Sequence, residues 1–545
     1  MDHLDSRAAE GVSLAGAGHW VEAAKACAEV VAGGRSDYRI HSLYGSVLMR
    51  CGRYEDARDQ LGVALLYSPE SIEVRNNLAA TQLKLGEPCL TEETCRAILA
   101  ECPDYLPAWA NLGLALCHQG RVPEGLEAMQ RAIELSPDDP ILRDNLLLNL
   151  NYIATDGQDL AFVHEALCGD LGRSPKKPLP NTGSRRIRIG YVSNDFKSHS
   201  VSFFIAGVIR AHSRSAFEVF CYSTTPAPDR RTENFRELAD HFVDLSNCSD
   251  VEAAQRVEAD QIDILVDLGG HTSGNRLGIF ALRPAPVQVS YLGYPATTGC
   301  SFIDYRVVDA LTDPEENSSF STERLVRLTP PFLAYLPHST FPATAQLPAL
   351  ANGYLTFGSF NHSSKISDDT LELWSMVLTK VPDSRLFLKA RAFSDAKVCD
   401  GYRERFSQRG IDGARLSFSG FTEGTQEHLA AYGKIDIALD TFPYNGTTTT
   451  CEALWMGVPV ITLVGNLHAA RVGYTLLTSV GLGDLAATSA ADYVALAATF
   501  PEDLNHLANL RRSLQRIVAS SALCDPSRLT LELETAYRKM LEDHV

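Results

Sequence analysis

The stretch Asp440-Thr-Phe-Pro-Tyr-Asn-Gly-Thr-Thr-Thr-Thr-Cys-Glu-Ala-Leu-Trp-Met-Gly457 joins an expected strand to an expected helix. Before it, residues 435–439 form a mostly apolar run of the kind that makes a buried parallel strand. Within it, residues 451–456 have the pattern of a helix start, closed by the glycine at 457 and followed by Pro459. A strand that leads through a polar turn into a helix is the repeating unit of an α/β fold.

The turn of this stretch is rich in groups that bind anions. Its polar residues are Asn445, Gly446, Thr447, Thr448, Thr449 and Thr450. Hydroxyls and unpaired backbone N–H groups at a helix N-terminus hold a phosphate, because the helix dipole adds partial positive charge there. An ordinary helix cap would need only one threonine, so we favour a phosphate site over a cap alone. Glu452, early in the helix, is placed to hydrogen-bond a ribose hydroxyl.

Strands and helices alternate through residues 186–345 and again, after a Pro- and Ala-rich link, through residues 346–545. Strands are expected at 186–193, 217–223, 262–268, 286–292 and 305–308, and then at 355–360, 385–390, 415–419, 435–439 and 458–464. This alternation predicts two Rossmann-like, doubly wound domains, each with a parallel sheet covered on both faces. Ligands of such sheets bind beyond the strand C-termini, so we expect a cleft between the two domains. The helices expected at 501–519 and 527–541 should pack back across the join.

Residues 1–155 carry an internal repeat. Its period of 34 residues is kept by Gly18, Gly52, Gly86 and Gly120, and by Pro69, Pro103 and Pro137. The period and the small/large alternation resemble the tetratricopeptide repeat, whose antiparallel helix pairs stack into an α-solenoid. We expect four repeats and a degenerate fifth, followed by a Pro/Gly-rich transition over residues 156–185. Because such solenoids bind proteins, the repeat predicts a macromolecular partner.

The composition indicates a cytoplasmic protein with no nucleic-acid or membrane partner. The formal net charge of −18 disfavours nucleic acid, which would require a basic face. The thirteen cysteines include no C-x-x-C pair, which is typical of a reducing compartment and predicts neither a disulfide framework nor a metal site. No apolar run reaches 18 residues, and the first residues lack a signal-peptide pattern.

Several polar residues follow expected strand ends, where a ligand would lie. Lys365 follows the strand at 355–360 and could neutralise a diphosphate leaving group. His199 follows the first strand and is a candidate acid/base, although a lone histidine is often structural. His271 and His428 have comparable positions. The sequence contains no G-x-x-x-x-G-K-[ST] loop, which excludes a P-loop nucleoside triphosphatase.

Together with the helical repeats, five motifs resemble the O-linked N-acetylglucosamine transferases and the related SPINDLY protein O-fucosyltransferases. They are Gly190-Tyr-Val-Ser-Asn-Asp-Phe-x-x-His199, Arg283-Pro-Ala-Pro-Val-Gln288, Gly293-Tyr-Pro295, Phe357-x-x-Phe-Asn-x-x-x-Lys365 and Asn445-Gly-Thr-Thr-Thr-Thr450. The resemblance covers nearly the whole chain. It implies a GT-B glycosyltransferase fold and an inverting, metal-independent transfer of a sugar to Ser/Thr hydroxyls of proteins. It also implies that the C-terminal half binds the nucleotide sugar and that no cofactor is needed.

The resemblance also implies roles for individual residues. Lys365 is similar to the diphosphate-binding lysine of the family, and Thr448 and Thr449 match its phosphate-binding threonines. Glu452 stands where an acidic residue holds the ribose, His199 matches the active-site histidine, and His428 matches one that lines the nucleotide pocket. The same motifs suggest Asn361 for the donor site, and as candidate sugar or acceptor contacts they suggest His271, Tyr294, Pro295 and His362.

The sugar donor stays open at this point. Animal acetylglucosamine transferases have other residues at four positions, which here are Asp263, His271, His362 and Thr447. The four threonines and Leu439-Asp-Thr-Phe-Pro-Tyr444 look more like the SPINDLY branch. We take UDP-GlcNAc as the first donor and GDP-fucose as the alternative. A further alternative is a repeat scaffold whose transferase half binds nucleotide but turns over weakly.

Overall fold

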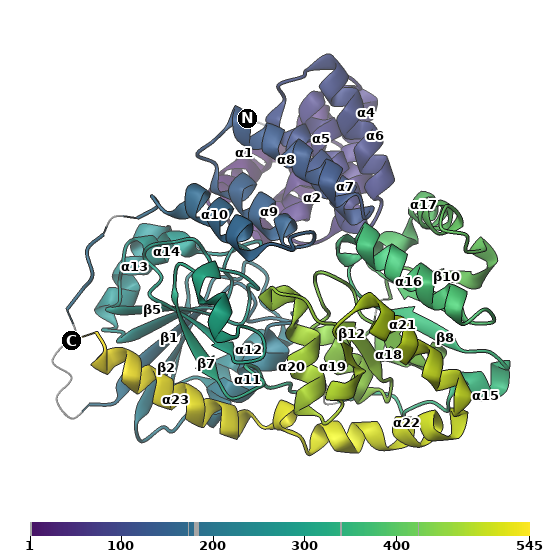
Figure 1. Cartoon of the computed structure of the whole chain (residues 1–545). Helices are drawn as coiled ribbons and strands as arrows, with labels where there is room; N and C mark the ends of the chain where they lie inside the picture. Colours follow the sequence, from purple (N-terminus) through teal and green to yellow (C-terminus); the bar gives the residue numbers. More distant parts are fainter. Residues whose placement is uncertain (1–2, 173, 179–184, 338–339, 423, 545) are drawn as a thin grey trace.

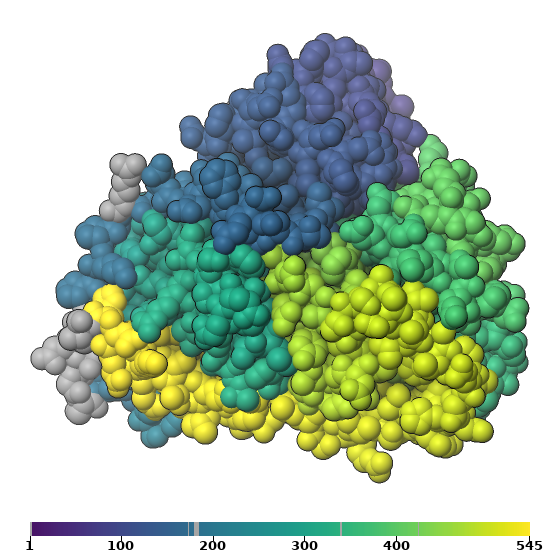
Figure 2. Space-filling model, viewed as in Figure 1, coloured from purple at the N-terminus to yellow at the C-terminus, as the bar shows by residue number. Residues whose placement is uncertain are grey.

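The computed structural model describes residues 3–172, 174–178, 185–337, 340–422 and 424–544. A helical array, drawn in purple and blue, lies across two α/β units drawn in teal and in green to yellow (Figure 1). The space-filling view shows the array resting on both units at once (Figure 2). The predicted order of parts, an α-solenoid followed by two doubly wound units of the GT-B type, is confirmed.

The solenoid consists of paired helices. They are α1 (His3–Gly16), α2 (Trp20–Ala32), α3 (Tyr38–Arg50), α4 (Tyr54–Tyr67), α5 (Ile72–Leu85), α6 (Pro88–Glu101), α7 (Leu106–His118), α8 (Val122–Leu135), α9 (Pro140–Leu150) and α10 (Gly157–Cys168). The glycines of the 34-residue period lie between the two helices of a pair, and all have positive φ: Gly18 (79°), Gly52 (75°), Gly86 (89°) and Gly120 (76°). A side chain would be strained in that left-handed conformation, which explains the periodic glycines. Helix α10 occupies part of the interval 156–185 that was expected as a transition.

The first sheet contains seven parallel strands in the order β3-β2-β1-β4-β5-β6-β7. They are β1 (Ile187–Ser193), β2 (Phe217–Ser223), β3 (His241–Asp244), β4 (Ile264–Asp267), β5 (Val287–Tyr291), β6 (Tyr305–Asp309) and β7 (Arg324–Leu328). The five expected strands are present, whereas β3 and β7 were not expected. These two lie at the edges of the sheet and are only half-buried, so they lack the continuous apolar run of a central parallel strand.

The second sheet has the order β10-β9-β8-β11-β12-β13 and is also parallel. Its strands are β8 (Thr356–Ser359), β9 (Arg385–Lys389), β10 (Leu416–Ser419), β11 (Ile437–Leu439), β12 (Val460–Leu463) and β13 (Ala486–Ala487). In each sheet the strand order reverses once, at β1/β4 in the first sheet and at β8/β11 in the second. Such switch points are where open α/β sheets bind ligands, just beyond the strand C-termini.

Helices cover both sheets. They are α11 (Ser202–Ala211), α12 (Arg230–Leu238), α13 (Asp250–Ala259), α14 (Leu277–Ala281), α15 (Pro348–Asn352), α16 (Asp368–Lys380), α17 (Ala396–Ser407), α18 (Thr425–Ala430), α19 (Thr448–Trp455), α20 (Val472–Ser479), α21 (Ala490–Thr499), α22 (Leu504–Ala519) and α23 (Pro526–Glu542). Across the described residues, no helix combines the length and apolar character needed to span a membrane.

The last two helices cross from the second unit back to the first, as predicted. Helix α22 lies under the second unit, and α23 continues beneath the first (Figure 1). The buried Glu534 of α23 accepts a hydrogen bond from Nδ1 of His212 at 3.0 Å, and the hydroxyls of Tyr537 and Tyr191 are 3.3 Å apart. Helix α23 is therefore part of the core of the first unit.

The solenoid is joined to both units by buried hydrogen bonds. Toward the first unit, Nδ2 of Asn151 donates to the hydroxyl of Tyr294 at 3.0 Å. Toward the second, the hydroxyls of Ser363 and Ser364 donate to the backbone carbonyls of His118 (2.7 Å) and Cys117 (2.8 Å) at the end of α7. The solenoid thus bridges the two units over the cleft.

Candidate active site

A cavity of about 280 Å³ lies between the two α/β units, at the switch points of both sheets. Eight residues expected from the sequence line it: His199, Pro295, Asn361, His362, Lys365, Thr447, Thr448 and Thr449. Tyr444, Phe332 and His468 line it as well and were not singled out beforehand. The structure therefore brings residues from six loops, far apart in the sequence, to one site.

The turn before α19 is organised by the buried carboxylate of Asp440. One carboxylate oxygen accepts from the backbone N–H groups of Gly446 (2.7 Å) and Thr441 (2.9 Å), and the other accepts from the hydroxyl of Thr462 (2.8 Å). Burial raises the pKa of Asp440 to about 6, against the opposing effect of these hydrogen bonds and of Lys365. The carboxylate holds the turn in shape, so that the first turn of α19 faces the cavity.

The four threonines have two different roles in the fold. Thr447, Thr448 and Thr449 line the cavity, and the hydroxyl of Thr449 donates to Oδ1 of Asn361 at 2.9 Å. Thr450 is buried, and its hydroxyl donates to the carbonyl of Gly446 at 3.1 Å. Thr450 was expected to contact the nucleotide, but it does not line the cavity. Its hydroxyl instead stabilises the turn through the bond to Gly446. Asn445 and Gly446 are also buried.

Lys365 brings a positive charge to the cavity. Its Nζ donates to the carbonyl of Asn445 at 2.8 Å and lies 4.0 Å from the centre of the Tyr444 ring. Burial lowers the pKa of Lys365 to about 8, although Asp440 opposes the change. A lysine held by a carbonyl and an aromatic face loses little freedom when an anion binds, which makes it a preorganised partner for a phosphate.

The pKa of Lys365 predicts how nucleotide binding depends on pH. Below about pH 8 the lysine is an ammonium ion, and above it the neutral amine gains nothing from a diphosphate. A bound diphosphate would raise that pKa, so the affinity for a nucleoside diphosphate should fall above pH 8, by up to about tenfold per pH unit. Calorimetric titrations between pH 7 and 9.5 test this. Lys365→Ala should give a flat profile over that range, and an equally steep profile for Lys365→Ala would show that another group titrates.

Glu452, on α19, and His428, on α18, belong to a separate hydrogen-bond network. Nε2 of His428 donates to Glu452 at 2.9 Å, and the hydroxyl of Tyr432 donates to the same oxygen at 3.2 Å. Lys389 Nζ donates to Nδ1 of His428 at 3.0 Å, so a further cation that was not expected lies here. These residues are beside the cavity and not in its wall. A ribose hydroxyl that donates to Glu452 would have to replace the hydrogen bond from His428 or Tyr432, or bind the carboxylate in addition to them.

His199 lies in the loop after β1 and keeps 44% of its side chain exposed. Its Nδ1 is 3.3 Å from a carboxylate oxygen of Asp195, four residues earlier in the chain. The side chain lines the cavity, and its role as an acid/base stays a prediction.

His271 and Tyr294 do not lie in the cavity, contrary to their expected contact with sugar or acceptor. Both are buried where the solenoid meets the first unit. The Tyr294 hydroxyl donates to His164 at 2.7 Å, and His271 donates through Nδ1 to Asp144 (2.7 Å) and through Nε2 to the Thr298 carbonyl (2.7 Å). The resemblance placed them by sequence position alone, and the end of the solenoid covers that position.

His271 is a charged member of this joint. Burial disfavours its charge, but its hydrogen bonds to Asp144 and Cys168 outweigh burial and raise its pKa to about 10. The sulfur atoms of Cys168 and Cys300 lie within 4.8 Å of its ring nitrogen. Because both ring nitrogens already donate hydrogen bonds, we interpret the group as a structural joint.

Comparison with known proteins agrees with this architecture. The model of glycosyl transferase family 41 matches residues 171–343 and 334–533, and tetratricopeptide repeat models match residues 8–71 and 107–139. Among solved structures, a mutant O-GlcNAc transferase from Thermobaculum terrenum is similar with a TM-score of 0.87 and 35% identity, covering 93% of this chain and 98% of that one.

Two curated relatives illustrate the range of similarity. A protein from Oryza sativa subsp. japonica, named probable UDP-N-acetylglucosamine–peptide N-acetylglucosaminyltransferase SPINDLY, is 40% identical over 76% of this chain and 46% of its own length. The UDP-N-acetylglucosamine–peptide N-acetylglucosaminyltransferase of Caenorhabditis elegans is 28% identical over 70% of this chain and 44% of its own. The chain spans about half the length of these relatives. On the match to the family model, the chain belongs to glycosyl transferase family 41.

Proposed function

We propose that the chain is an inverting, metal-independent protein O-glycosyltransferase that transfers N-acetylglucosamine from UDP-GlcNAc to Ser and Thr hydroxyls. The observation that carries the proposal is the convergence of Lys365, Thr448 and Thr449 on one cavity at the switch points of both sheets. The names of the relatives support the donor, and the solenoid over the cleft suits a protein acceptor.

The diphosphate of the donor would lie against the first turn of α19. There, the threonine hydroxyls and the backbone N–H groups would bind its oxygens, and Lys365 would balance its charge. As the bond between the sugar and the phosphate breaks, negative charge grows on the diphosphate, so these groups stabilise the transition state more than the ground state. In this proposal Lys365 and the helix N-terminus would supply the positive charge, so the transfer would need neither a metal ion nor a cofactor.

A second donor, GDP-fucose, has a specific observation in its favour. The turn has Thr447 at the position where animal acetylglucosamine transferases have histidine, and Tyr444 beneath Lys365 belongs to the stretch that looks like the SPINDLY branch. The alternative is a scaffold that binds nucleotide but turns over weakly. The cavity disfavours it, because Lys365 and the threonines line its wall.

A donor panel tests the proposal. We expect calorimetry to show UDP and UDP-GlcNAc binding at least tenfold more tightly than GDP and GDP-fucose, and UDP-GlcNAc alone to label a degenerate pool of Ser/Thr peptides. Tighter binding and labelling by GDP-fucose would replace the donor but keep the enzyme class. Nucleotide binding without labelling by either donor would favour the scaffold.

A further inference from the structure

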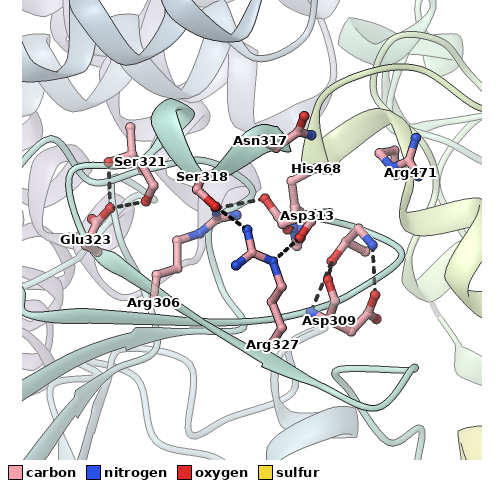
Figure 3. A network of polar contacts seen from close by, with 12 residues as sticks. Arg306, Asp309, Asp313, Asn317, Ser318, Ser321, Glu323, Arg327, His468 and Arg471 are labelled. Carbon is pink, nitrogen blue, oxygen red and sulfur yellow. Dashed lines mark hydrogen bonds and ion pairs between the residues drawn. The ribbon is translucent and has the colours of Figure 1, made fainter. Parts of the chain in front are cut away.

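His468 lines the cavity, and the proposed function gives it no role so far. It begins the short 3₁₀ helix His468–Ala470, just after β12 of the second unit, and only 7% of it is exposed. Its Nδ1 donates a hydrogen bond of 2.5 Å to Asp313, which follows β6 in the first unit (Figure 3). The two residues are 155 positions apart, so the pair exists only where the two units meet.

The carboxylate of this pair is held in its charged form. Burial disfavours ionisation of Asp313, but His468 and Arg306 outweigh burial and hold its pKa well below its usual range. Arg306 contributes from β6, with its Nη1 3.4 Å from the second carboxylate oxygen. A buried carboxylate that accepts from Nδ1 fixes the histidine tautomer and stabilises a positive charge on the ring.

Three more hydrogen bonds between the units hold the loops that carry the pair. Asn317 Nδ2 donates to the carbonyl of Asn466 (2.6 Å), Arg471 Nε donates to the carbonyl of Leu311 (2.6 Å), and the Thr475 hydroxyl donates to Asp309 (2.8 Å). Asn317, Arg471 and Asp309 surround the pair in Figure 3. The ring of Phe332 packs edge-on against His468 at 5.0 Å. The imidazole is therefore fixed in direction before any substrate binds.

The other ring nitrogen is available for chemistry. Among the residues that the structure describes, Nε2 of His468 has no hydrogen-bond partner. In the neutral ring whose Nδ1 hydrogen is given to Asp313, Nε2 has a lone pair and can accept a proton. By contrast, His199 is 44% exposed and lies 3.3 Å from Asp195, so it is less firmly held.

We propose that His468 is the general base of the transfer, with Asp313 as its positioning residue. The inference rests on the proposed glycosyl transfer. As the acceptor hydroxyl oxygen bonds to the anomeric carbon, its proton moves to Nε2 of His468. The bond between the anomeric carbon and the phosphate breaks, and its electron pair leaves with the diphosphate. Asp313 stabilises the imidazolium until the proton is released to water. Because His468 belongs to the second unit and Asp313 to the first, the pair forms only when the two units have the relative position seen here.

Two substitutions of His468 separate a base from a binding contact. In His468→Asn, the amide can take the place of Nδ1–H and keep the bond to Asp313 while Nε2 is lost. In His468→Gln, the amide reaches the position of Nε2 and can still hydrogen-bond a hydroxyl, but it is not basic. We expect both to bind UDP and UDP-GlcNAc within about threefold of the wild type, and to slow single-turnover labelling of the peptide pool by roughly 10²–10⁴-fold.

Asp313→Asn should slow the same step as strongly, whereas Asn317→Ala, which removes only one of the three hydrogen bonds that hold the loops, should slow it by no more than about threefold. If His468→Gln transfers normally while His468→Asn loses affinity for UDP-GlcNAc but not for UDP, His468 is a sugar contact and the proposal is wrong. Equal slowing by Asn317→Ala would attribute the loss of rate to a weakened contact between the units, and would also overturn the proposal.

If the wild type labels peptides only with GDP-fucose, the donor proposal fails, and the same comparison of rates is made with that donor. No labelling by the wild type with either donor would refute the proposed function and the base together.

Discussion

Lys365→Ala is expected to lose at least a hundredfold in single-turnover transfer and to bind UDP and UDP-GlcNAc more weakly. The lysine is fixed between the Asn445 carbonyl and the Tyr444 ring, at the end of the cavity where the α19 turn would hold the diphosphate. A preorganised charged donor of this kind contributes on the order of 3 kcal/mol to the transition state. Because the charge of the leaving group grows during the reaction, the loss in rate should exceed the loss in affinity.

Two further variants sharpen this experiment. Lys365→Arg should restore transfer only in part, because a planar guanidinium cannot occupy the position of an ammonium between a carbonyl and a ring. Lys380→Ala removes an exposed lysine from the end of α16 in the same unit and serves as the matched control. Transfer by Lys365→Ala at the wild-type rate would show that the threonine turn handles the diphosphate alone.

A chain that begins at Arg186 is expected to lose most of its stability. Without the solenoid, Tyr294 loses Asn151 and His164, and the buried, charged His271 loses Asp144. Each lost hydrogen bond contributes about 0.5–1.5 kcal/mol net, and one between charged groups about 1.5–3 kcal/mol, so the loss should reach roughly 3–6 kcal/mol. Urea unfolding followed by tryptophan fluorescence and circular dichroism measures it.

A chain that begins at Arg35 is the matched control. It lacks α1 and α2, whose hydrogen bonds in the described residues stay within the solenoid. We expect it to unfold within about 1–2 kcal/mol of the full chain, because solenoid stability is close to a sum over neighbouring repeats. Equal midpoints for the Arg186 chain and the full chain would show that the joint at Tyr294 and His271 contributes little.

Elements with a strong local signal could be predicted from the sequence. The periodic glycines require positive φ, and the central strands of both sheets are buried on both faces, so each leaves a pattern within a few residues. The strands β3 and β7, at the edges of the first sheet, are half exposed and leave a weaker pattern. They could be recognised only once the neighbouring strands were in place.

In the candidate site, too, the sequence predicts what has a local signal and misses what depends on packing. Lys365 and the threonine turn follow strand ends and were found by that signal, whereas the direction of each side chain depends on packing. Thr450 faces inward, and the end of the solenoid covers His271 and Tyr294. The pair of His468 and Asp313 also follows two strand ends, but its partners come from different units, and no local pattern could join them.

Helix α23 links the folding of the first unit to the time course of translation. Tyr191 in β1 contacts Tyr537 in α23, 346 residues later in the chain. At ribosomal rates of about 5–20 residues per second, roughly 20–70 s separate the synthesis of the two residues. During that interval the surface that α23 will cover, which includes the helix α11, is open. The nascent chain therefore presents this apolar surface to chaperones until α23 emerges, and the first unit completes its core after the second has been made.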